Sequence, residues 1–77
     1  MNESAAAIAV DPDIQGGTPC FAGTRVPVKA LFDAVAHGRS VDYFLSQFPS
    51  VTAGQVREVL QQAERLVSED ARRPHAA

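Results

Sequence analysis

The sequence contains one cysteine, one tyrosine and no tryptophan in 77 residues. A single cysteine excludes an internal disulfide and a zinc site built from several thiolates. We therefore expect a reducing, cytoplasmic setting. No run of about 18 apolar residues occurs, so we expect no membrane-spanning helix. The first residues lack the basic flank and the apolar core of a secretory leader, so we expect no such signal.

Charge of either sign is also limited. Seven Lys and Arg residues against nine Asp and Glu residues give a formal net charge of -2. This slight acidity argues against a nonspecific binder of polyanions. The middle of the chain is its basic part, because residues 16–40 carry Arg25, Lys29 and Arg39 against Asp33.

The chain length allows one small domain. A chain this short buries only about 60% of the surface that it exposes when unfolded, so its core is marginal. Domains of this size commonly depend on a staple or a partner chain. We therefore expect a homodimer. The pattern of residues predicts a domain over residues 8–70, with a disordered N-terminus at 1–7 and a flexible tail at 71–77.

Residues 8–28 have an extended pattern that reverses once. The first extended run ends at Asp11-Pro12-Asp13, because proline has no amide hydrogen and restricts the residue before it. Gly16-Gly17 supplies the positive φ angles that a reversal requires. Residues 19–22 can then pair back as a second short strand. An isolated hairpin is barely stable in water, so this one must pack on other elements.

Three helical patterns follow the hairpin. Gly38 ends the first helix, Ser40 is the N-cap of the second, and Thr52 with Gln55 forms a capping box at the start of the third, which runs to about residue 70. The fold class is therefore mainly α: a three-helix helix-turn-helix bundle with a short N-terminal β-hairpin. Phe32, Phe44 and Phe48 fall on the apolar sides of these helices and are expected in the core. Apolar residues recur at helical spacing in each helix: Val28, Leu31, Phe32, Val35 and Ala36; Val41, Phe44, Leu45 and Phe48; Val56, Val59, Leu60, Ala63, Leu66 and Val67.

The second and third helices are separated by Pro49-Ser50-Val51, a turn length typical of helix-turn-helix units. In such units the first turns of the last helix enter the major groove. There Gln55 can pair with adenine and Arg57 with guanine. Alternatively, Gln55 only completes the cap and Arg57 is a solvated charge, since three-helix units also serve as protein-binding modules. The candidate DNA-binding residues are Arg25, Lys29, Arg39, Thr52, Gln55 and Arg57.

Two glycine-containing motifs resemble a known family. The run Asp11-Pro12-Asp13-Ile14-Gln15-Gly16-Gly17-Thr18-Pro19 and the run Gly23-Thr24-Arg25-Val26-Pro27-Val28 are similar to the bacterial and archaeal family called domain of unknown function 433. Gly38, Phe48-Pro49 and Thr52 continue the pattern of that family. The resemblance covers residues 8 to about 67.

This resemblance implies a winged or hairpin-extended helix-turn-helix module. Many proteins of the family look like antitoxins that are encoded beside a toxin with a PIN-like ribonuclease domain. The resemblance thus implies that the chain binds and silences such a nuclease and contacts operator DNA. The chain departs from the family at Thr18 and Ala22, where relatives often carry Lys and Arg, so two phosphate contacts are absent.

Arg25 has two interpretations. Its guanidinium either bridges the loop to Asp11, Asp13 or a helix C-terminus, or it binds a phosphate or acidic residues of a partner. The two aspartates themselves are expected to cap a turn.

Four residues are candidates for a dimer or partner interface. Phe21 lies on a hairpin that is too short to bury it alone, and Tyr43 lies off the apolar side of its helix. Leu66 and Val67 lie near the end of a helix that is long for so small a domain.

No pattern in the sequence indicates catalysis. His37, His75 and Cys20 lack the spacing of metal ligands, and the glycine pairs lack the Lys-Ser/Thr of a phosphate-binding loop. We expect no metal, no cofactor and no enzymatic activity. The leading hypothesis is an antitoxin-like regulator that neutralises a PIN-like ribonuclease toxin. The alternative is a protein-interaction or assembly module without DNA binding.

Overall fold

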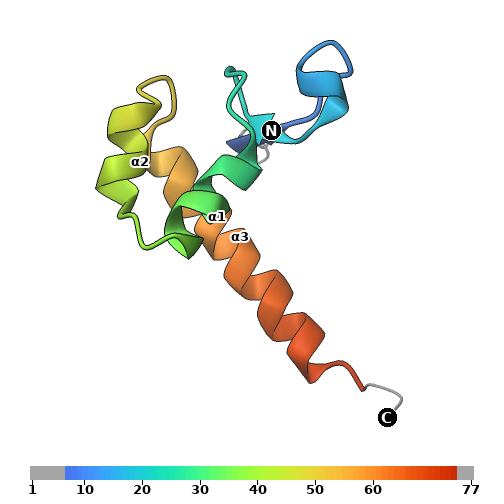
Figure 1. Cartoon of the computed structure of the whole chain (residues 1–77). Helices are drawn as coiled ribbons and strands as arrows, with labels where there is room; N and C mark the ends of the chain where they lie inside the picture. The colour runs from blue at the N-terminus through green and yellow to red at the C-terminus, as the bar shows by residue number, and fades with distance from the viewer. Residues whose placement is uncertain (1–6, 75–77) are drawn as a thin grey trace.

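A short antiparallel hairpin precedes three helices in the computed structural model, which describes residues 7–74 (Figure 1). The predicted mainly α fold class is therefore confirmed. The elements are β1 (Ile8–Ala9), the 3-10 turn η2 (Gln15–Gly17), β2 (Cys20–Phe21), α1 (Val28–Ala36), α2 (Val41–Gln47) and α3 (Ala53–Arg72). In this part of the chain, no helix combines the length and the apolar character needed to cross a membrane.

The hairpin pairs Ile8 with Phe21 and Ala9 with Cys20. The chain reverses where Gln15, Gly16 and Gly17 have φ angles of 53°, 64° and 90°. Glycine adopts such angles without a steric penalty because it has no Cβ. The predicted reversal at the glycine pair is therefore confirmed.

The predicted end of the first helix and the predicted starts of the second and third helices rest on local capping and are also confirmed. Gly38 has a φ of 82° just after α1. The Ser40 hydroxyl accepts a hydrogen bond from the Tyr43 amide at 3.0 Å. At the start of α3, Thr52 and Gln55 form the reciprocal capping box. Each cap satisfies backbone groups that the first or last helical turn leaves unpaired.

The core lies where the hairpin meets the three helices. Its centre is aromatic, because the ring centroids of Phe21 and Phe44 lie 5.9 Å apart and those of Phe44 and Phe48 lie 5.0 Å apart. Offset aromatic pairs at such distances are favourable. The buried residues of this core cluster are Ala7, Phe21, Leu31, Phe44, Val51, Val56 and Val59.

The apolar side of α1 is less covered than predicted. Only Leu31 is fully buried in this helix, whereas Phe32 is 38% exposed and Val35 is 46% exposed. The prediction that Phe32 belongs to the core is therefore wrong. The spacing identified the apolar side of the helix, but no other element of the described chain packs over the whole of it.

The described fold includes Ala7 at one end and continues to Arg72 at the other. Ala7 is buried, and its carbonyl accepts a hydrogen bond from the Ala22 amide at 3.0 Å, so residue 7 is part of the fold. Residues 1–6 and 75–77 of the expected flexible ends lie outside the described residues. α3 continues to Arg72, so Ala71 and Arg72 are helical. The C-terminal half of α3 extends away from every other element (Figure 1).

Candidate functional site

An apolar groove runs between the hairpin, α1 and α3. It encloses about 160 Å³ and is lined by Ile8, Val28, Phe32, Val59, Gln62, Ala63 and Leu66. This volume is smaller than that of the pockets that hold drug-sized ligands, which are about 300 Å³ or more. The groove therefore suits side chains of a protein partner better than a small molecule. The sequence showed the apolar sides of both helices, but not that a groove between them would stay open.

The groove continues onto the projecting part of α3. Leu66 is 66% exposed and Val67 is 69% exposed. These two residues were predicted to lie at an interface, and the structure places them on the helical segment with the fewest neighbours (Figure 1). We refer to the groove together with Val67 as the apolar surface. Contiguous exposed apolar residues typically mark an interaction site.

The start of α3 exposes only some of the residues expected there. Thr52, Ala53, Gly54 and Arg57 are exposed. Gln55 is half-buried, and both polar atoms of its side-chain amide form hydrogen bonds. Its Oε1 accepts from the Thr52 amide at 3.0 Å, and its Nε2 donates to the Ala22 carbonyl at 3.0 Å. Of the two interpretations of Gln55, the cap is the one that the structure shows, and the bond to the hairpin turns its amide inward.

Arg25 lies on a tight loop beside this helix start. Its side chain is exposed, and it makes no ion pair with any residue between 7 and 74. The predicted bridge from Arg25 to Asp11 or Asp13 is therefore not found. Asp11 instead caps its own turn, since its carboxylate accepts from the Asp13 amide at 2.9 Å, as expected of a turn residue.

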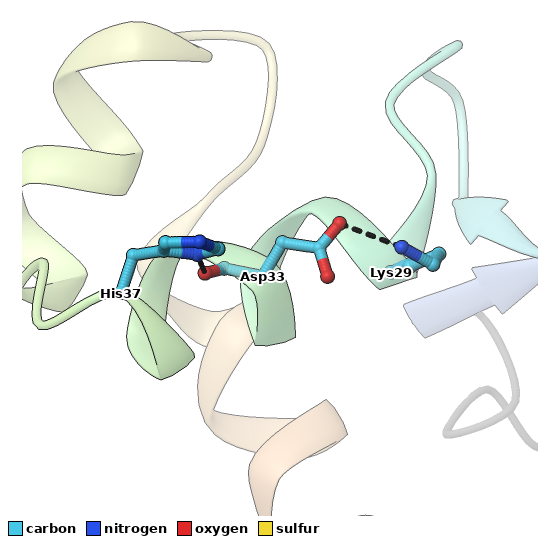
Figure 2. Close-up of polar contacts among 3 residues, drawn as sticks. All are labelled: Lys29, Asp33 and His37. Atoms are coloured by element: carbon cyan, nitrogen blue, oxygen red, sulfur yellow. Dashed lines mark hydrogen bonds and ion pairs between the residues drawn. The ribbon is translucent and has the colours of Figure 1, made fainter.

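Lys29 is already paired on the surface of α1. Its Nζ lies 2.8 Å from Oδ2 of Asp33, and both side chains are more than half exposed. The carbonyl of Asp33 also accepts a hydrogen bond from Nδ1 of His37 at 2.7 Å (Figure 2). An exposed pair of this kind contributes little to stability. For Lys29 to bind DNA, this weak pair must open.

Arg39 and Tyr43 form a separate surface pair. The guanidinium carbon of Arg39 lies 4.9 Å from the centroid of the Tyr43 ring, a cation–π geometry. Tyr43 remains 42% exposed. This pair links a candidate DNA contact to a candidate partner contact, at the junction of α1 and α2.

Phe21 is not available to any partner. It is 0% exposed and packs against Phe44. The prediction that a partner chain covers Phe21 is wrong, because its ring packs into the core of the same chain.

A second hollow, of about 170 Å³, lies inside the hairpin. It is lined by Ala9, Asp11, Ile14, Thr18, Cys20, Gly23 and Thr24. Cys20 is buried and its thiol donates to the Thr18 carbonyl at 3.3 Å. Among residues 7–74, no group of three or more His, Cys, Asp or Glu residues could hold a metal ion.

Comparison with known proteins identifies the family. The chain is 46% identical over 50 residues to the uncharacterized protein y4eO of Sinorhizobium fredii (strain NBRC 101917 / NGR234), and the match covers 65% of this chain. The same match covers only 23% of y4eO, so this relative is much the longer protein. No solved structure matches the chain significantly. Residues 8–63 include the hairpin, α1, α2, the first half of α3 and most of the apolar groove. They match the family described as "Protein of unknown function (DUF433)", and the chain belongs to that family.

Proposed function

We propose that this chain is an antitoxin-like regulator that binds and neutralises a PIN-like ribonuclease through the apolar surface. The observation that carries the proposal is the exposure of Leu66 and Val67 on a helix that extends beyond the rest of the fold. Full burial of such a side chain stabilises a complex by about 1.5 to 3 kcal/mol. The identity of the partner rests on the resemblance of the sequence to antitoxin-like relatives.

The same surface serves equally well for self-association. Phe32 and Leu66 line one groove from two different helices, so a single partner helix can cover both. A homodimer formed in this way fits the small size of the core, since such domains commonly gain stability from a partner chain. In this proposal, the nuclease and a second copy of the chain compete for the groove.

Contact with operator DNA is the second part of the proposal. Arg57, one turn into α3, and Arg25, on the adjacent loop, are exposed and unpaired within residues 7–74. Guanidinium groups in this state are free to bind phosphates or guanine. A second candidate function, a protein-interaction module without DNA binding, is favoured by one observation: Gln55 is committed to the cap and the hairpin.

Co-expression tests the partner-binding part. We expect the chain to co-purify with a PIN-like nuclease encoded beside its gene and to inhibit RNA cleavage by that nuclease. The double variant L66A/V67A should lose co-purification. The matched control R65A/E69A changes two exposed residues of the same helical segment that do not line the groove, and it should retain binding. Equal binding by both double variants would refute this assignment of the docking surface.

A further inference from the structure

Gln55 connects two segments that lie 33 residues apart in the sequence. Its Nε2 donates to the carbonyl of Ala22, at the start of the loop that carries Arg25. Arg57 follows two residues after Gln55 on α3. One side-chain amide therefore links the two backbone segments that carry these exposed arginines, in addition to the packing of Phe21 on Phe44.

The loop that carries Arg25 is closed by its own hydrogen bonds. The Thr24 hydroxyl donates to the Phe21 carbonyl at 2.8 Å and accepts from the Val26 amide at 3.0 Å. The Phe21 amide donates to the Val26 carbonyl at 3.0 Å. On the outer side, Gln15 Nε2 donates to the Arg25 carbonyl at 3.1 Å. Because the loop is rigid, fixing its first residues also fixes the backbone of Arg25.

We propose that Gln55 is a positioning residue that reads no base and holds Arg25 in register with Arg57, so that both arginines bind phosphates of the same DNA duplex. The inference rests on the proposed DNA contact and gives it a geometry. Bidentate pairing with adenine requires the amide oxygen and nitrogen that Gln55 already uses for the Thr52 amide and the Ala22 carbonyl. Because Gln55 already holds the loop in place, the loop loses less conformational entropy when Arg25 binds DNA.

Two variants separate the positioning contact from the helix cap. In Q55E the carboxylate still accepts from the Thr52 amide, as glutamate does in capping boxes, but it cannot donate to the Ala22 carbonyl. A53E is the matched control for charge, because Ala53 is exposed in the same helical turn and its replacement leaves both Gln55 contacts in place. Q55A adds no charge and keeps the hydrogen bond from the residue 55 amide to the Thr52 hydroxyl.

The assay is fluorescence anisotropy with a labelled mixed-sequence duplex of about 25 base pairs at low salt, where phosphate contacts dominate binding. R25A and R57A are each combined with wild-type, A53E, Q55E and Q55A backgrounds. We expect R57A to weaken binding about tenfold in every background, as the loss of a charged hydrogen bond would. We expect R25A to weaken duplex binding about tenfold in the wild-type and A53E backgrounds. In the Q55E and Q55A backgrounds, R25A should weaken it less than about twofold.

An equal loss from R25A in all four backgrounds would overturn the positioning role while leaving DNA binding intact. Absence of duplex binding by the wild-type chain would overturn the proposed DNA contact and this inference together, and the nuclease-binding test would stand unaffected. Should Q55E not fold, as judged by circular dichroism, the Q55A background alone decides between these results.

Discussion

Replacement of Phe21 by alanine should remove a large part of the folding free energy of this domain. Phe21 is 0% exposed and joins the hairpin to the helices through its contact with Phe44. By contrast, Phe32 is an aromatic residue of the same type that is 38% exposed at the groove. The two residues thus provide a matched pair of substitutions, one in the core and one on the surface.

The expected magnitudes follow from burial. Truncation of a buried phenylalanine to alanine costs about 3 to 5 kcal/mol, because the lost transfer free energy is added to the cost of the cavity. A domain of 77 residues has a total stability of about 4 to 12 kcal/mol. F21A should therefore remove between about a quarter and all of the folding free energy. F32A should cost only about 1 kcal/mol, since its ring is already partly in water.

Urea denaturation followed by far-UV circular dichroism measures both free energies of unfolding. The experiment should be repeated at two protein concentrations, because a residue at a dimer interface gives a loss that depends on concentration. F21L, which keeps most of the apolar volume, should recover much of the loss from F21A. Equal costs for F21A and F32A, or a cost of F21A that vanishes at high protein concentration, would refute the placement of Phe21 in the core.

Three further substitutions test the caps and the apolar surface. T52A should lower the free energy of unfolding by about 1 kcal/mol in urea denaturation, because an N-cap is lost; no change would show that the capping box is not formed. G38A should lower it by about 1 kcal/mol, since a Cβ disfavours the φ of 82° after α1, and an unchanged midpoint would contradict that turn. L66A/V67A should change it by less than about 0.5 kcal/mol in the isolated monomer, as expected of exposed residues, and a larger loss would place these side chains in the core.

Local signals made the helices predictable. Ser40, Gly38 and the Thr52–Gln55 box each act within a few residues, so the sequence contains all the information that they need. The hairpin reversal at Gly16-Gly17 is local in the same way. The order and type of the elements could therefore be predicted before any tertiary contact was known.

The burial of individual side chains was less predictable, because it depends on contacts between segments that are distant in the sequence. Phe21 is buried by helices that follow it, and Phe32 stays partly exposed because the hairpin and α3 leave a groove open beside it. Apolar periodicity identifies one side of a helix but not how much of that side the chain covers. The inward turn of Gln55 has the same origin, since its hydrogen bond to Ala22 spans 33 residues.

Hydrogen–deuterium exchange of the chain, alone and in complex with the proposed partner, a PIN-like nuclease, tests the proposed role of the apolar surface most directly. In the projecting half of α3, residues 64–72, every side chain except that of Ser68 is exposed, so the amides of this segment should exchange early in the free chain. We predict strong protection of this segment in the complex, together with the α1 residues that line the groove. Unchanged exchange of residues 64–72 in a complex that forms and inhibits the nuclease would contradict the account.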